Sequence, residues 1–353
     1  GNSMNFHTFE LSYKLSTDDV RIVYNELYNA SGQNYKPKDD CAVFNALQDY
    51  GIIIFIKKYK QDEYNHHVLY YRINPRRVLE NHNYIGIFNS KNIDKLIKKF
   101  NILIKTVSPF LPEFDSCNIS RIDYCSNVEL NDQAVIDSYI NLLKRGYFQS
   151  KYTIKKYKNE KSKRNTLSKN GITITGNNGI EVTYYNKYRQ LKEKNPKCRY
   201  IDNSKKIIRI EIRCFKKKVR HLTKKFKCTS ASSFLKESDI IGKYIFKHYA
   251  NIFYGTGDFY KLTDIYAMID KSSCKKNSKK LMKELVKSSA THSSLDMAFD
   301  ILNFNKSQIK AILKKFNKIG VSPVVIPRRY EFDTIRNPLD LALEYSDYDD
   351  LCV

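Results

Sequence analysis

Three segments of the chain alternate apolar and polar residues, which is the pattern of a β-strand with one buried face. They span residues 119–127, 181–187 and 207–214. In each segment the polar positions hold acidic and basic side chains together, and the last one has isoleucines at every second position. If the three strands are neighbours in one sheet, their charged side chains converge on a single surface.

Weaker periodicities extend this picture into an α+β fold. Apolar residues at intervals of three and four predict helices, whereas short alternating runs predict strands. Asn177-Asn178-Gly179 is typical of a tight hairpin turn. We expect further strands at 51–58, 67–74, 152–158 and 171–175, and helices at 92–107, 132–143, 276–288 and 307–319.

The order of these elements predicts a mainly antiparallel sheet with flanking helices, built from two successive halves. Each half begins with a strand and a helix and continues with further strands. A tract rich in Lys and Ser at 216–233 separates this part from a chain end in which the pattern is helical. Since 353 residues are many for one domain, we predict a larger domain over 5–215 and a smaller, mostly helical region over 216–353.

The net charge of +25 exceeds what solubility requires and indicates a polyanionic partner, either nucleic acid or an anionic membrane surface. Residues 144–227 hold 27 basic and 5 acidic residues, a net charge of +22. Biased codon usage would also enrich Lys and Tyr, but it would not gather the charge in one segment. No apolar run reaches the roughly 18 residues of a membrane span. We therefore expect a cytoplasmic protein that binds nucleic acid rather than a membrane.

Neither the cysteines nor the histidines predict a metal site. The eight cysteines are scattered and lack Cys-x-x-Cys pairs, so we interpret them as reduced thiols. His66 and His67 are adjacent in a predicted strand, and adjacent strand residues face opposite ways.

Carboxylates in the middle of two strands are better candidates for chemistry. Asp123 follows Arg121 by two residues, and Glu211 lies between Arg209 and Arg213. Taken singly, each is explained by a ladder of charges on a solvated sheet face. A buried carboxylate, by contrast, needs a cation or a metal as partner.

Together the two strands predict a divalent metal site. Mg²⁺ or Mn²⁺ binds through a few oxygen ligands and usually keeps some of its water. Asp123 and Glu211 would supply two carboxylates, with Glu181 or Asn127 in support.

A tyrosine at the end of the middle strand is a candidate nucleophile. In the run Tyr184-Tyr185-Asn186-Lys187-Tyr188, Tyr185 and Lys187 share one strand face. A deprotonated phenol attacks a phosphodiester if cations or a metal hold the phosphate, and Lys187 would supply part of that charge. The alternative is that Tyr185 is one of the many tyrosines that favour strands.

At these residues the chain resembles rolling-circle replication initiators, both those of small Gram-positive plasmids and the nicking replication proteins of filamentous phages. The resemblance spans most of the chain in five ordered pieces, Tyr71-Arg-Ile-Asn-Pro-Arg-Arg-Val-Leu79, Ile119-Ser-Arg-Ile-Asp-Tyr-Cys-Ser-Asn-Val128, Tyr184-Tyr-Asn-Lys187, Ile207-Ile-Arg-Ile-Glu-Ile-Arg213 and Gly320-Val-Ser-Pro-Val-Val-Ile-Pro327.

The resemblance implies a relaxase-like nicking sheet. It implies that the strands of Asp123 and Glu211 line the active site and that Tyr185 is the nucleophile. Members of these families often carry a second acid four residues after the first, where this chain has Asn127.

The sequence therefore predicts a metal-dependent endonuclease that nicks one strand of origin DNA through a 5′-phosphotyrosine and later rejoins it. The helical end would contact duplex DNA or partners, and a host helicase and polymerase are expected to act with it. A conjugative or transposon relaxase would use the same chemistry, and a non-catalytic DNA-binding protein on the same fold is the remaining alternative. The cations expected to hold DNA phosphates are Arg121, Arg209, Arg213, Lys216, Lys217 and Lys218.

Overall fold

The computed structural model describes most of the chain. The described residues are 5–36, 40–61, 64–79, 88, 90–149, 151–158, 165–166, 168–250 and 257–344.

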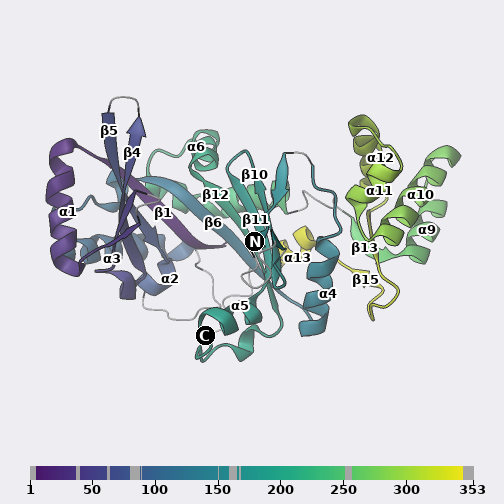
Figure 1. Ribbon diagram of the computed structural model, residues 1–353, viewed down its shortest axis with the longest axis horizontal. Helices are drawn as coiled ribbons and strands as arrows, with labels where there is room; N and C mark the ends of the chain where they lie inside the picture. Colours follow the sequence, from purple (N-terminus) through teal and green to yellow (C-terminus); the bar gives the residue numbers. More distant parts are fainter. Residues whose placement is uncertain are drawn as a thin grey trace.

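A ten-stranded sheet forms the centre of the molecule (Figure 1), and every pairing within it is antiparallel. The predicted α+β class with a mainly antiparallel sheet is confirmed. Across the sheet the strands are β2 (Asn34–Lys36), β3 (Cys41–Phe44), β4 (Ile52–Gln61), β5 (Tyr64–Ile73), β1 (Asn5–Leu15), β6 (Asn118–Glu129), β12 (Ile207–Phe215), β11 (Ile180–Asn186), β10 (Gly171–Gly176) and β7 (Tyr152–Ile154).

Two halves of similar design meet at the middle of this sheet. In the first, strand β1 is followed by helix α1 (Thr17–Ser31), and β5 returns to pair with β1. In the second, β6 is followed by α4 (Gln133–Leu143), and β12 returns to pair with β6. Strands β1 and β6 pair with each other, so the halves lie edge to edge as one sheet. The strand-helix-strands order expected from the sequence is confirmed for the second half.

One face of the sheet is apolar and carries the core. Ile122 on β6, Ile212 on β12 and Val182 on β11 are all fully buried there. The alternation seen in the sequence produces this face, because side chains two residues apart in a strand point the same way.

Helices from both ends of the chain contribute buried residues to this one core. They include Leu27 of α1, Phe100 of α3, Val219 of α6 and Phe246 of α8. Besides α1 and α4, the helices of this part are α2 (Pro75–Val78), α3 (Ile93–Val107), α5 (Lys187–Lys194), α6 (Lys216–Lys225), α7 (Ala231–Lys236), α8 (Ser238–Tyr249) and α13 (Pro338–Glu344).

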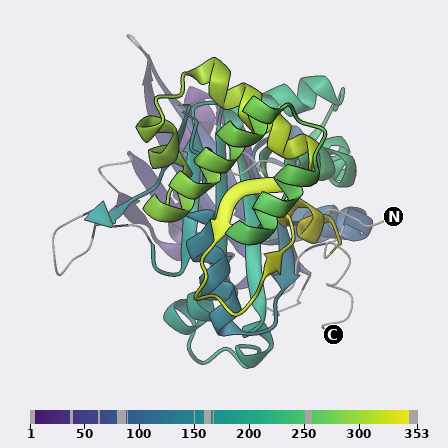
Figure 2. The ribbon, with the colours of Figure 1, turned by 90° about the vertical axis from the view of Figure 1, so that its right-hand side faces the viewer.

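A second, smaller unit lies at the end of the molecule opposite to α1 (Figure 1), and Figure 2 shows its helices in front of the large sheet. Strand β13 is central in its three-stranded sheet, parallel to β14 and antiparallel to β15. Its elements are β13 (Asp258–Lys261), α9 (Leu262–Lys271), α10 (Lys276–His292), α11 (Leu295–Ile301), α12 (Lys306–Lys318), β14 (Val321–Ile326) and β15 (Thr334–Ile335).

The helices that follow residue 215, where the sequence predicts a domain boundary, pack beside the large sheet. Helices α6, α7 and α8 bury Leu222, Phe234 and Ile245 in the core beside the large sheet, and α13 contacts β6. The region after 215 therefore divides, with 216–249 and α13 beside the large sheet and 258–335 in the smaller unit. Local periodicity marks these segments as helical but does not show which surface their apolar stripes cover.

Most of the predicted elements are present, including the turn at 177–179, where Gly179 has φ +79°. Strand β1 and helix α1 were not predicted, although β1 occupies the middle of the sheet. Its signal was present, since Phe9, Leu11, Tyr13 and Leu15 alternate with polar residues. Among the described helices, none combines the length and the apolar character that crossing a membrane requires.

Candidate active site

The three strands singled out by their charges are neighbours, in the order β6-β12-β11. The pairing of residues between these three strands forms two rows of polar residues on the sheet face opposite to the core. In the first row Asp123, Arg213 and Glu181 lie side by side. The predicted convergence of the three strands is confirmed.

The second row lies four residues further along β6. Asn127, Arg209 and Tyr185 face one another across the three strands, and Glu211 is two residues before Arg213 on β12. The two rows therefore form one polar surface with a different composition at each end.

The first row is part of a continuous ladder of ion pairs. Arg121 donates two hydrogen bonds to Asp123, at 2.9 Å to Oδ1 and 2.6 Å to Oδ2. Arg213 donates to Asp123 Oδ1 at 3.2 Å and to Glu181 Oε1 at 2.6 Å. Asp123 is only 2 % exposed, so two arginines neutralise a carboxylate that burial would otherwise destabilise.

The ladder extends past β6 into the first half of the sheet. Glu10 on β1 accepts from Arg72 at 2.6 Å and from Arg121 at 3.4 Å. At the other end, Lys155 Nζ lies 3.8 Å from Glu181 Oε2. Four cations and three carboxylates thus alternate from β5 to the segment after β7, and the surface that they form is not acidic. Glu10 was not a candidate from the sequence, because β1 was not recognised as a strand.

The second row pairs a tyrosine with a carboxylate. The phenol of Tyr185 donates a hydrogen bond of 2.6 Å to Glu211 Oε1. Both side chains are partly exposed, whereas Arg209 and Lys187 beside them are buried. Lys187 Nζ lies 5.8 Å from the centre of the Tyr185 ring. A phenol bonded to a carboxylate that is able to take its proton, beside the buried guanidinium of Arg209, is an arrangement suited to activating a nucleophile.

The end of β11 determines where Lys187 lies. Asn186 closes the strand and caps helix α5, its side chain accepting a hydrogen bond of 3.1 Å from the backbone N–H of Arg189. Lys187 is therefore the first residue of α5, and its Nζ donates to Gln190 Oε1 at 2.9 Å. The asparagine between Tyr185 and Lys187 thus turns the chain from strand to helix.

Burial perturbs the titration of these groups. Loss of solvent raises the pKa of Tyr185 well above its ordinary value, and the charge of Glu211 raises it further. Burial, together with the nearby charge of Arg209, lowers the pKa of Lys187 well below its usual range. The tyrosine is therefore neutral at rest, and its activation requires a base.

A histidine that the sequence did not single out lies in the same place. Burial, then the charges of Arg209 and Lys187, lower the pKa of His7 on β1 to about 3. His7 Nδ1 lies 2.8 Å from Thr8 Oγ1. His7 is thus neutral at ordinary pH and does not add to the positive charge around the site.

The two neighbouring tyrosines are placed differently from Tyr185. Tyr184 points to the apolar face, is fully buried, and donates to the backbone oxygen of Ala250 at 2.6 Å. Tyr188 lies on α5 between Lys192 and Lys205, whose Nζ atoms are 6.0 and 5.9 Å from its ring centre. Of the three, Tyr185 alone is hydrogen-bonded to a carboxylate among the described residues.

The four side chains expected to bind Mg²⁺ or Mn²⁺ are each hydrogen-bonded to a neighbouring side chain in this arrangement. Asp123 and Glu181 accept from arginines, and Asn127 Oδ1 accepts from Arg209 at 2.7 Å. Glu211 is bonded to Tyr185 instead. Within the described part of the chain, no group of three or more His, Cys, Asp or Glu side chains is placed to hold a metal ion.

Two of the cations expected to contact DNA are buried. Arg209 is fully buried beside Asn127. Lys218 is 8 % exposed, and its Nζ donates to the hydroxyl of Tyr249 at 2.7 Å. In this arrangement neither side chain lies at the surface where contact with DNA was expected: Arg209 is covered within the polar row beside Asn127, and helical periodicity turns Lys218 towards the core.

The neighbours of Lys218 on α6 are exposed. Lys216 and Lys217 precede it at the start of the helix, and both reach the surface. Arg121 and Arg213 are partly exposed within the ladder. These four remain candidates for contact with DNA.

No family model matches the chain, and a search of curated proteins finds no match. Among solved structures, the chain is similar to "Structure of Rolling Circle Replication Initiator Protein from Geobacillus stearothermophilus". The two are 13 % identical, the match covers 79 % of this chain and 91 % of the other, and the TM-score is 0.33. That structure is of the kind of protein that the sequence motifs resemble.

Proposed function

We propose that this chain is a DNA-nicking and rejoining enzyme in which Tyr185 is the nucleophile, as in the initiation of rolling-circle replication. The observation that carries the proposal is the 2.6 Å hydrogen bond from the Tyr185 phenol to Glu211, beside the buried guanidinium of Arg209. A nucleophile bonded to a base, near fixed positive charge, is the arrangement that phosphoryl transfer needs.

In the proposed reaction Glu211 removes the phenolic proton as the Tyr185 oxygen attacks a backbone phosphorus. A bond forms between that oxygen and phosphorus, and the bond from phosphorus to the 3′ oxygen breaks. The 5′ phosphate stays on Tyr185, and the 3′ oxygen takes a proton from solvent and becomes a free hydroxyl. Attack by that hydroxyl on the phosphotyrosine reverses the steps and rejoins the strand.

The arginines around the site have an electrostatic part in this reaction. Arg209 is fixed close to the phenol before the reaction begins, so it stabilises negative charge on Tyr185 and on the phosphate without having to be reoriented. Lys187, whose ammonium form burial disfavours, lies beside the ring of Tyr185. Arg121 and Arg213 are partly exposed and would contact the DNA backbone over the first row.

A requirement for Mg²⁺ or Mn²⁺ stays a prediction, and no step above depends on an ion. We still expect a divalent ion to assist the cleavage, since Mg²⁺ is often held by one or two carboxylates together with phosphate oxygens of the substrate. Adduct formation should then stop in EDTA and return when Mn²⁺ is added. If nicking continues unchanged in EDTA, the reaction does not need a divalent ion. The proposed roles of Tyr185 and Glu211 would not be affected by that result.

A cleavage assay tests the nicking activity. Supercoiled plasmids carrying fragments of the genome that encodes the chain are incubated with protein and Mn²⁺, and any protein attached to DNA is recovered after denaturation. We expect one fragment to become nicked, with the protein covalently bound at the 5′ end and Tyr185 as the modified residue in a peptide digest. DNA binding to all fragments with no nicks and no adduct would favour the non-catalytic alternative.

A further inference from the structure

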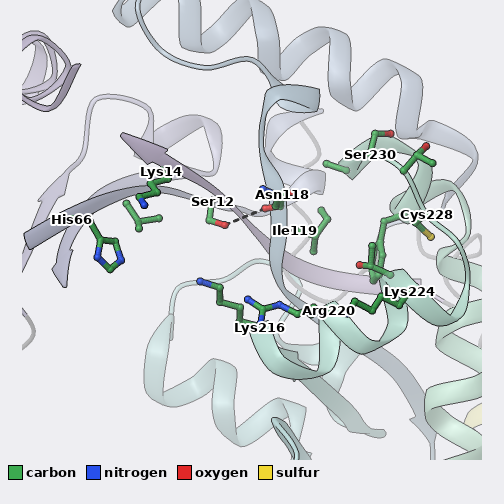
Figure 3. A pocket seen from close by; sticks show the side chains of 15 residues that line it. Ser12, Lys14, His66, Asn118, Ile119, Lys216, Arg220, Lys224, Cys228 and Ser230 are labelled. Carbon is green, nitrogen blue, oxygen red and sulfur yellow. Dashed lines mark hydrogen bonds between the residues drawn. The ribbon is translucent and has the colours of Figure 1, made fainter. Parts of the chain in front are cut away.

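A basic pocket lies outside the tyrosine site, with a cavity of about 490 Å³. It is bounded by β1, β5, the start of β6, and helices α6 and α7 (Figure 3). Four of its lining residues are strong cations, Lys14, Lys216, Arg220 and Lys224, and His66 adds a fifth basic side chain. Among the described residues, no carboxylate lines it.

The cations of the pocket differ from those of the ladder. Every arginine of the ladder is paired with a carboxylate, whereas the described residues provide no ion pair to Lys14, Lys216, Arg220 or Lys224. A concave surface with several uncompensated cations attracts an anion with more than one negative charge.

Helix α6 arranges three of these cations as a row. Lys216, Arg220 and Lys224 are four residues apart, so they follow one face of the helix, and all three are exposed. The opposite face of the helix buries Val219 and Leu222 in the core. The row is thus held at a fixed position against the sheet and is not a mobile tail.

One wall of the pocket belongs to the polar sheet face that carries the tyrosine site, whereas the wall from α6 and α7 comes from helices that pack on the core. Ser12 and Lys14 lie two and four residues after Glu10 on β1, so their side chains point to the same sheet face as Glu10, which belongs to the ladder. Ser12 pairs with Asn118 at the start of β6, and Asn127 at its other end faces Arg209 and Tyr185. Nine residues of strand separate the two asparagines, about 30 Å at 3.3 Å per residue.

We propose that this pocket binds the phosphate backbone of the DNA at a second position, about nine base pairs from the bond that Tyr185 cleaves. The spacing follows from about 30 Å of strand and roughly 3.4 Å per base pair of duplex. The ladder between the two positions has its carboxylates neutralised, so it does not repel a polyanion. This inference depends on the proposed function for its ligand, but its test does not require cleavage.

A cysteine in the wall of the pocket allows its occupancy to be measured by chemical modification. Cys228 lines it and is partly exposed, and Cys274, on the smaller unit, is also a free and partly exposed thiol. The rates at which a maleimide alkylates Cys228 and Cys274 are measured by mass spectrometry of the full chain, without DNA and with a 30-base-pair duplex of random sequence. We expect the duplex to slow alkylation of Cys228 about tenfold and to leave Cys274 unchanged. Equal rates at Cys228 with saturating duplex overturn the proposal.

Matched variants provide a second readout. Lys216→Ala with Lys224→Ala should weaken binding of the same duplex about tenfold and lower the slope of log K against log salt by about 0.9 for each phosphate that the protein no longer neutralises. The control is Lys95→Ala with Lys98→Ala, which removes the same charge from exposed positions of α3, a helix packed on the core face. If both pairs change the slope equally, the effect is one of net charge and the pocket has no special part.

Two further outcomes separate this inference from the proposed function. Protection of Cys228 by inorganic phosphate but not by the duplex would make the pocket a small-anion site and overturn the inference. Adduct formation on Tyr185 is followed in parallel, at saturating DNA. Normal adduct with an unprotected Cys228 overturns the pocket alone, whereas a protected Cys228 without adduct overturns the nicking reaction alone and leaves the pocket as a DNA site.

Discussion

The phenol of Tyr185 and the carboxylate of Glu211 belong to adjacent antiparallel strands and are joined by a hydrogen bond of 2.6 Å. They are not directly opposite in the register, since Glu211 faces Thr183 and Tyr185 faces Arg209. The bond therefore runs diagonally across β11 and β12 and brings the carboxylate to a phenol whose direct cross-strand neighbour is a guanidinium. We therefore expect different effects on adduct formation when Tyr185 and Glu211 are replaced in turn.

Replacing Tyr185 by phenylalanine should abolish covalent attachment to DNA, because only the attacking oxygen is removed. Affinity for DNA should change by less than about twofold. Tyr188→Phe is the matched control and should form the adduct at the normal rate. The measurement is recovery of protein-linked DNA after denaturation. Persistent adduct in Tyr185→Phe would refute the assignment of the nucleophile.

Replacing Glu211 by glutamine should slow adduct formation by about 10²- to 10⁴-fold, the usual contribution of a general base. The amide oxygen still accepts the hydrogen bond from Tyr185, so the geometry and the affinity for DNA should be kept. Single-turnover rates of adduct formation and a binding titration measure the two quantities. A normal rate in this variant would show that another group takes the proton.

Replacing Asp123 by asparagine should lower the free energy of unfolding by about 3 kcal/mol, because it leaves Arg121 and Arg213 without their shared buried partner. Asp202→Asn is the control, since it removes one partner of an exposed ion pair with Lys205 and should leave the free energy of unfolding nearly unchanged. Urea denaturation measures both. A fully stable Asp123→Asn variant would mean that this carboxylate is not a structural partner of the arginines.

The stability should also depend on the ionisation of Asp296, which accepts from the backbone N–H of Phe148 with both oxygens, at 3.1 and 3.2 Å. Burial raises the pKa of Asp296 from 3.8 to about 6. A carboxyl whose folded pKa is raised stabilises the fold below its unfolded pKa and no longer does so once the pH has risen through about 6.

Asp296→Asn should therefore be more stable than the wild type at about pH 7.5, by about 1 kcal/mol after allowing for solvent screening. The difference should vanish below about pH 3, where the wild-type carboxyl is protonated in both states. Asp264→Asn, an exposed position on α9, is the control and should show no such trend. Urea denaturation at several pH values gives the comparison, and a difference that grows towards acid pH would contradict the raised pKa.

Strand alternation in the sequence determined which residues share a face, and this was enough to predict that Asp123, Glu211 and Tyr185 lie on one polar surface. That inference depends on the period of two within each strand, which is a local property. The position of Lys187 just after Tyr185 was also visible in the sequence.

The partners that these side chains have on other strands were decided only by the tertiary structure. Arg121, two residues before Asp123 in the same strand, is a partner that the sequence already placed beside it. Whether Arg213 joins this pair depends on the register between β6 and β12, in which the two residues are 90 positions apart, and no local pattern encodes that register. In the same way Lys216 and Lys218 are equivalent in sequence, yet one lines a pocket and the other is bonded to Tyr249, because the helix packs one side on the core. The sequence shows which residues are charged. Which of these charges are neutralised by a partner depends on contacts between segments that only folding brings together.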